Sequence, residues 1–152
     1  MRVLRRFQTF LLSSEPSEAE AVEALRMLYA VAFLAQVGLA GLVGISTSLF
    51  GSGAPSRGIF GLPLLGVSMS MPVLALVLSL AIARTGGRPA VLTATILAAV
   101  LLAAPAWLLA FALVTGHGDW PVLAMAGVVA FGYALGLLLI GRFAPHAVQT
   151  VS

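Results

Sequence analysis

The segment Pro89–Val114, PAVLTATILAAVLLAAPAWLLAFALV, decides the fold class because no charged side chain interrupts it. An α-helix crosses the hydrocarbon core of a bilayer with about 20 predominantly apolar residues, and this segment exceeds that length. Its apolar run is continuous and lacks the alternation of apolar and polar residues seen in strands of membrane barrels. The segment therefore predicts a transmembrane helix.

Three further segments outward from this one have the same character: Leu25–Phe50, Ile59–Ala83 and Pro121–Gly141. The 152-residue chain is 61% hydrophobic and 9% charged, with a mean hydropathy of +1.10, whereas soluble domains carry about 25% charged residues. This composition excludes a soluble enzyme and a nucleic-acid-binding protein, and the absence of cysteine excludes disulfides and thiol catalysis. We predict an all-α, polytopic integral membrane protein whose four transmembrane helices form a bundle.

The distribution of arginine predicts the orientation. All basic residues except the two histidines are arginines, and all arginines but Arg57 lie in the N-terminal arm, in the loop around Arg84 and Arg88, or near the C-terminus. The positive-inside rule then places both termini in the cytoplasm. Tyr29 and Trp120 stand at the predicted inner and outer boundaries, where aromatic side chains often anchor helices. The exclusive use of arginine suggests a GC-rich bacterial genome, so we expect a multi-pass protein of a bacterial-type inner (plasma) membrane.

The chain before the first span is divided into a basic and an acidic part, which together form a predicted cytoplasmic segment, residues 1–24. Projected as a helix, residues 2–11 place Arg2, Arg5 and Arg6 opposite an apolar face. This pattern predicts an amphipathic interfacial helix whose arginines contact lipid headgroups, with a frayed cytoplasmic arm as the alternative. Ser17 and Glu20 have the spacing of a capping box, which predicts a helix start there. Residues 25–142 form the predicted transmembrane domain, and residues 143–152 a cytoplasmic tail.

Small residues predict where the helices pack, because helices in lipid associate through close van der Waals fit. The fourth span carries Gly132 and Gly136 in a GxxxG pattern, and the first span carries Gly38, Gly41 and Gly44 at a spacing of three. The third span carries alanines at a spacing of four. Such patterns fit packing within one chain as well as packing between chains.

Two prolines lie inside spans, Pro72 in the second and Pro105 in the third, and both are predicted to kink their helices. The Ser68 hydroxyl lies four residues before Pro72 and is expected to support the disturbed backbone. Together with Ser70 and Gln36, the most polar residue deep in a span, these positions form a candidate pathway for a neutral solute. Kinks that only shape the helices are the simpler interpretation.

The chain offers little for catalysis or metal binding. Within the predicted spans Arg26, at the very start of the first, is the only ionisable Asp, Glu, Lys, Arg or His residue, so ion-coupled transport has no obvious carrier. His117 and His146 fall on opposite sides of the membrane in the predicted topology and cannot share a metal. His117 and Asp119 in an outer loop, with Arg57, could engage a lipid phosphate, although solvated loop residues are the simpler interpretation. We expect no cofactor, no metal site and no catalytic residue.

These observations leave three hypotheses for the function. The first is a non-catalytic accessory or assembly subunit, whose small-residue faces pack against a larger membrane-protein partner or against a second copy in a homo-oligomer. The second is a small oligomeric transporter or channel-like protein for a neutral or hydrophobic solute. The third, an enzyme acting on lipid headgroups at the outer loops, has the weakest support. All three hypotheses place the protein in a lipid bilayer, which is its expected environment.

Overall fold

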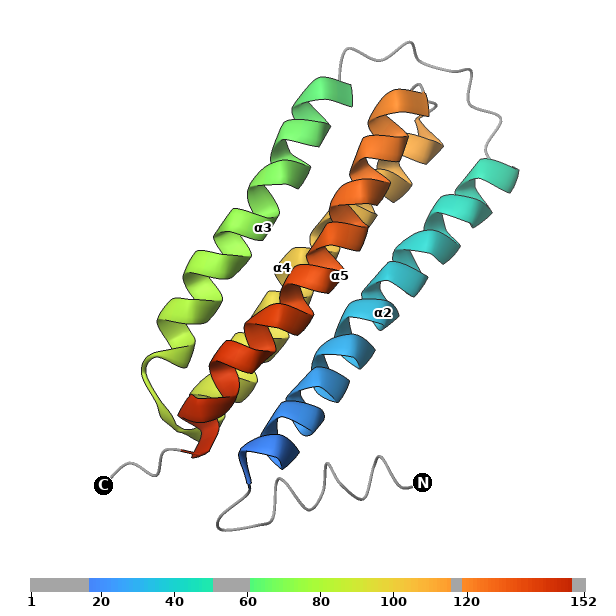
Figure 1. Cartoon of the computed structure of the whole chain (residues 1–152). Helices are drawn as coiled ribbons and strands as arrows, with labels where there is room; N and C mark the ends of the chain where they lie inside the picture. The colour runs from blue at the N-terminus through green and yellow to red at the C-terminus, as the bar shows by residue number, and fades with distance from the viewer. Residues whose placement is uncertain (1–16, 51–60, 116–118, 149–152) are drawn as a thin grey trace.

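The computed structural model describes residues 17–50, 61–115 and 119–148, and within these ranges every regular element is an α-helix. The helices are α2 (Glu18–Phe50), α3 (Gly61–Ala83), α4 (Gly87–Val114) and α5 (Asp119–Val148), shown in Figure 1. Each of them is long and apolar enough to cross a membrane. The predicted all-α, four-span fold is therefore confirmed. The interfacial helix predicted around Arg2, Arg5 and Arg6 lies outside the described residues.

The start of α2 follows the predicted capping box. The backbone N–H of Ser17 donates to a carboxylate oxygen of Glu20 at 3.0 Å, and the backbone N–H of Glu20 donates to the Ser17 hydroxyl at 3.3 Å. These reciprocal bonds satisfy two donors at the helix start. With 33 residues, α2 is about 50 Å long, whereas a hydrocarbon core is about 30 Å thick. Helix α2 is therefore longer than a straight crossing of the apolar layer requires, and Glu18 and Glu20 lie in its first turn.

The helices α4 and α5 form the centre of the bundle, and α2 and α3 flank them on opposite sides (Figure 1). Helix α4 contacts the three other described helices, and α5 does so too, whereas α2 and α3 make no contact with each other within the described ranges. Helices that follow one another in sequence are therefore not always neighbours in space. The start of α2 and the end of α5 lie at the same end of the bundle, as an even number of spans requires (Figure 1).

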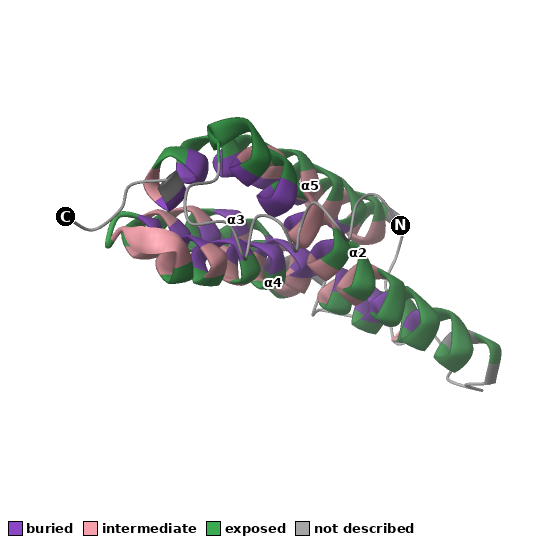
Figure 2. Ribbon diagram, turned by 90° about the horizontal axis from the view of Figure 1, so that it is seen from below, coloured by how far each residue is buried: buried purple, intermediate pink, exposed green. Residues whose placement is uncertain are grey.

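The core is built mainly from small side chains of α4. Its alanines at positions 94, 98, 99, 103, 106 and 110 are all buried, and their small size lets neighbouring backbones approach closely. Figure 2 shows that buried residues lie on the faces that the helices turn toward one another. Thr95 is buried among them, and its hydroxyl donates to the Val91 carbonyl at 2.8 Å within the same helix. Pro72 and Pro105 are also buried, each inside a continuous helix.

Helix α5 continues two turns past its predicted end at Gly141. Residues 142–148 continue the helix instead of belonging to a tail, and Phe143, Ala144 and Ala147 among them are buried against the bundle. Arg142 lies exposed on the opposite side of this extension. The burial of one face explains why the helix persists through Arg142, where hydropathy alone indicates an end.

The connection between α3 and α4 is tight. Gly86 and Gly87 both adopt φ of 80°, a backbone conformation that favours glycine. The backbone N–H of Thr85 donates to the Ile82 carbonyl at 3.0 Å, and that of Gly86 donates to the Ala83 carbonyl at 3.2 Å. This turn fixes the position of Arg84 at the end of α3.

Candidate functional site

The GxxxG pattern of α5 is filled by an aromatic side chain of α2. The Tyr29 hydroxyl donates to the backbone carbonyl of Gly132 at 2.9 Å. A Cβ atom at Gly136 would overlap the Tyr29 ring, and one at Gly132 would lie 2.9 Å from the carbonyl oxygen of Leu102 on α4. The two glycines therefore admit a tyrosine ring on one side and a helix backbone on the other, and they join α5 to both α2 and α4.

Tyr29 was predicted to anchor α2 at a membrane boundary, and this prediction is wrong. The side chain is fully buried, stacks with the ring of Tyr133 of α5 and lies tilted against the ring of Phe33 of α2. The ring centroids of Tyr29 lie 5.6 Å from Phe33 and 6.0 Å from Tyr133, and Phe33 lies 5.3 Å from Tyr133. Such ring pairs contribute more to stability than their buried apolar area alone would. The small residues at 132 and 136 make the space in which Tyr29 fits, so the ring lies inside the bundle instead of at its rim.

A second junction joins α2 to α4 further along the helices. Ala40 of α2 forms a small buried cluster with Ala106 and Ala110 of α4, and a Cβ atom at Gly44 would lie 3.4 Å from Ala110. These contacts use only small side chains, so α2 and α4 approach closely there. Gly44 thus lies on the side of α2 that faces the bundle.

Gly38 and Gly41 do not share the face of Gly44. A spacing of three residues turns a helix by about 300°, so each step moves about 60° around the axis. Gly38 therefore lies about 120° from Gly44, with Gly41 between them. A Cβ atom built at Gly38 or Gly41 would meet no described atom within 4 Å. Both glycines are exposed, beside exposed Leu34 and Leu42, and Figure 2 shows this exposed stretch of α2 extending away from the other helices. We call Gly38, Gly41, Leu34 and Leu42 the open α2 face.

The structure does not bring the candidate pathway residues together within the chain. Gln36 is half-buried on α2, whereas Ser68, Ser70 and Pro72 lie on α3, which does not contact α2 in the described ranges. The Ser68 hydroxyl donates to the Leu64 carbonyl at 2.9 Å, one turn before the carbonyl that Pro72 leaves without a helical donor.

Hydroxyl groups within these helices mainly bond to their own backbone. Ser70 donates to the Val67 carbonyl at 2.8 Å, and the buried Ser79 donates to the Ala75 carbonyl. This pattern satisfies the hydroxyl donors without a ligand or a neighbouring helix. In the described part of the chain, no group of three or more His, Asp or Glu residues is arranged to hold a metal ion. His117 and Arg57, proposed with Asp119 for lipid phosphate, lie outside it.

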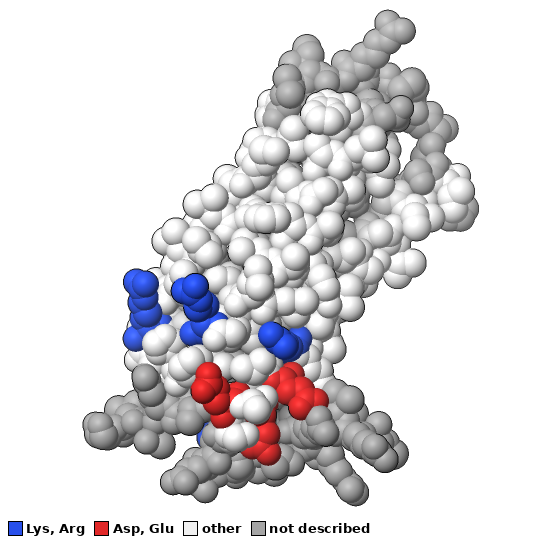
Figure 3. Space-filling view, viewed as in Figure 1, with Lys and Arg blue, Asp and Glu red and all other residues white. Residues whose placement is uncertain are grey.

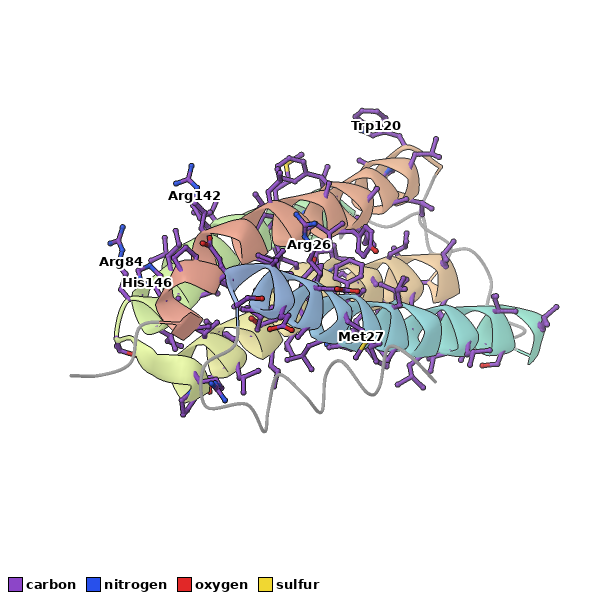
Figure 4. The ribbon with its side chains drawn as sticks, turned by 60° about the horizontal axis from the view of Figure 1, so that its bottom comes forward. Arg26, Met27, Arg84, Trp120, Arg142 and His146 are labelled. Atoms are coloured by element: carbon purple, nitrogen blue, oxygen red, sulfur yellow. The ribbon has the colours of Figure 1, made fainter. Side chains whose placement is uncertain are left out.

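Charged side chains gather at the end of the bundle where α2 starts and α5 ends (Figure 3). We call this the basic end, and its described charged residues are Glu18, Glu20, Glu23, Arg26, Arg84, Arg88 and Arg142. The arginines visible in Figure 3 lie closer to the apolar body of the molecule than the glutamates do. At the far end, Trp120 is 71% exposed at the start of α5 (Figure 4), a position compatible with the predicted anchoring at a membrane boundary.

Comparisons with protein families, with curated proteins and with solved structures return no match for this chain. The geometry alone therefore indicates which residues matter.

Tyr29 lies in a different place from the one predicted, although the sequence carried a signal for its buried position. Tyr29 and Phe33 are spaced as i and i+4 on one face of α2, a spacing that indicates a shared contact surface more directly than an interfacial anchor.

Proposed function

We propose that the protein is a non-catalytic accessory subunit of a membrane complex, and that it binds a transmembrane helix of a larger partner through the open α2 face. One observation supports this proposal above the others. Gly38 and Gly41 leave a smooth surface one turn long, and nothing else among the described residues covers it.

The energetics of glycine give this observation its weight. A glycine inside a helix is about 1 kcal/mol less favourable than alanine, so a glycine pair needs a reason. Gly132 and Gly136 have one inside the chain, because larger side chains would strike Leu102 and Tyr29. Gly38 and Gly41 have no such neighbour. Exposed leucines carry no comparable weight, because lipid tails are as apolar as leucine and their exposure to lipid is not unfavourable. Close approach of another helix is the usual use of exposed small residues in membranes.

We also propose that the membrane is a bacterial-type inner membrane and that the basic end faces the cytoplasm. The arginines Arg26, Arg84, Arg88 and Arg142 all belong to that end, which supports this orientation through the positive-inside rule.

The test is mild detergent extraction of the native membrane, followed by mass determination of the intact complex and identification of its components. We expect a discrete complex with a larger membrane protein. Gly41→Ile should release that partner, because the new side chain fills the surface that the partner helix requires. Gly127→Ile is the matched control, because Gly127 is an exposed glycine of α5 with equally open surroundings.

Two results would contradict the proposal. If the partner is released by Gly127→Ile and retained by Gly41→Ile, the interface lies on α5. A homo-oligomer that carries a neutral solute across the membrane of liposomes, with a flux that Gln36→Leu changes, would favour the transporter hypothesis. The pathway residues would then meet only between subunits.

A further inference from the structure

We propose that Arg84 and Arg142 form a site for the phosphate group of one anionic phospholipid at the basic end, between the ends of α3 and α5. This inference does not depend on the accessory-subunit proposal.

The two arginines come from neighbouring helices and share one side of the molecule. Helices α3 and α5 run in the same direction and contact each other. Figure 4 shows Arg84 at the end of α3 and Arg142 on α5 projecting in the same direction from the same end, with His146 close by. Both arginines are exposed.

The chain supplies no counter-ion to them within the described residues. The described glutamates Glu18, Glu20 and Glu23 are all on α2, which contacts α5 but not α3. In the described part of the chain neither Arg84 nor Arg142 lies within ion-pair distance of a carboxylate. Two like charges at the same end of the bundle, without a described carboxylate beside them, favour an anion from the surroundings.

The depth of the two arginines relative to the apolar segments indicates which anion they meet. Arg84 follows directly after the apolar segment Pro63–Ala83, and Arg142 lies inside the apolar segment Trp120–Ala147. Arg142 is fixed at that depth because Phe143 and Ala144 beside it are buried against the bundle. A guanidinium so placed extends to the layer of lipid phosphates. The glutamates lie further from the apolar body of the molecule than the arginines visible in Figure 3.

The chemistry of the side chains suits a phosphodiester. Arginine presents a planar fork of donors that binds phosphate oxygens in pairs. His146 lies four residues after Arg142 on the same face of α5, half-buried, and supplies a further N–H donor. The exposed Leu138, one turn before Arg142, continues this face into the apolar layer and provides a surface for an acyl chain.

The experiment measures lipid binding to the purified full chain by native mass spectrometry, titrating phosphatidylglycerol and, separately, phosphatidylcholine. We expect tighter binding of phosphatidylglycerol, and a loss of about tenfold in its affinity with Arg84→Ala or Arg142→Ala, because charge-assisted bonds exceed the effect of a dispersed surface charge. The double variant should lose less than the product of the two single losses, because both groups bind one phosphate.

Arg88→Ala is the matched control. Arg88 belongs to the same end and carries the same charge, but it is half-buried and already has an interaction within the molecule. It should lose less than about twofold. Arg142→Lys keeps the charge and the stem but not the fork, and it should still lose at least about threefold, which removes doubt about misfolding of the alanine variants.

Three outcomes would overturn the proposal. Equal losses for Arg88→Ala and Arg142→Ala would indicate a general surface charge and no site. Equal affinity for both lipids would show that the phosphate is not selected by charge. Inorganic phosphate that displaces phosphatidylglycerol at millimolar concentration, with the same sensitivity to Arg142→Ala, would identify a free phosphate as the ligand.

Discussion

Two glycine pairs of this protein have the same composition and opposite surroundings. Gly132 and Gly136 of α5 are covered by Leu102 and by the Tyr29 ring, whereas Gly38 and Gly41 of α2 meet no described atom at the position of a Cβ. In sequence, both pairs predict a helix contact. The difference shows that a pair of small residues marks a surface fit for close approach, whereas the partner for that surface comes from the rest of the structure. Substitutions at the two pairs should therefore differ in size and in kind.

The largest effect should come from Gly136→Val. Its side chain would overlap the ring of Tyr29, which is fully buried and cannot swing away freely. Overpacking of a closed core costs about 1–3 kcal/mol or more, and we expect the upper part of this range. The free energy of unfolding in detergent, measured by titration with a denaturing detergent, tests the prediction.

The contact between position 136 and the Tyr29 ring can be tested by the same measurement of unfolding free energy. If the overlap causes the loss, Gly136→Val should destabilise a Tyr29→Ala protein much less than it destabilises the parent, because the ring is gone. Equal losses in both backgrounds would mean that the penalty arises from the helix itself, and the comparison between the two glycine pairs would lose its basis.

Gly132→Ala should have the next largest effect. Its Cβ atom would lie 2.9 Å from the carbonyl oxygen of Leu102, so the backbones of α4 and α5 would have to separate. We expect a loss of about 1–2 kcal/mol in unfolding free energy. Gly127→Ala on the same helix is the control, since an alanine there meets open space and should be neutral or slightly stabilising.

Tyr29→Phe should have a smaller effect than either glycine substitution. It keeps the ring packing with Phe33 and Tyr133 and removes only the hydrogen bond to the Gly132 carbonyl. Hydrogen bonds between membrane helices contribute about 0.6 kcal/mol on average. A loss of that order in unfolding free energy is expected, and a loss as large as that of Gly136→Val would show that the hydroxyl, more than the fit of the ring, holds α2 to α5.

Much of the fold could be predicted from the sequence, because a bilayer leaves so few choices to an apolar chain. The uncharged run Pro89–Val114 implied a spanning helix, and the Ser17 to Glu20 spacing located the start of α2. Periodicity and composition describe one helix at a time. They could not show that α3 would lie apart from α2, its predecessor in the chain, because that arrangement depends on which faces fit together.

The site was harder to predict for the same reason. Tyr29 has both an apolar ring and a polar hydroxyl, so a boundary position and a buried position are equally compatible with its chemistry. The choice between them was made by the space at Gly136 and the carbonyl of Gly132, more than 100 residues away in the chain. The end of α5 was missed because hydropathy falls at Arg142, whereas the packing of Phe143 and Ala147 continues.

The smallest effect on stability should come from Gly41→Ala, and for that reason it is the sharpest test of the comparison. An alanine at this position meets no described atom and improves helix propensity by up to about 1 kcal/mol, so the unfolding free energy of the isolated chain should stay the same or rise. A clear loss would mean that α2 packs more closely in solution than the structure shows. An unchanged or higher stability would show that the isolated chain gains nothing from glycine here, and any advantage of this glycine must then come from a contact that forms outside the chain, as the proposed partner helix on the open α2 face requires.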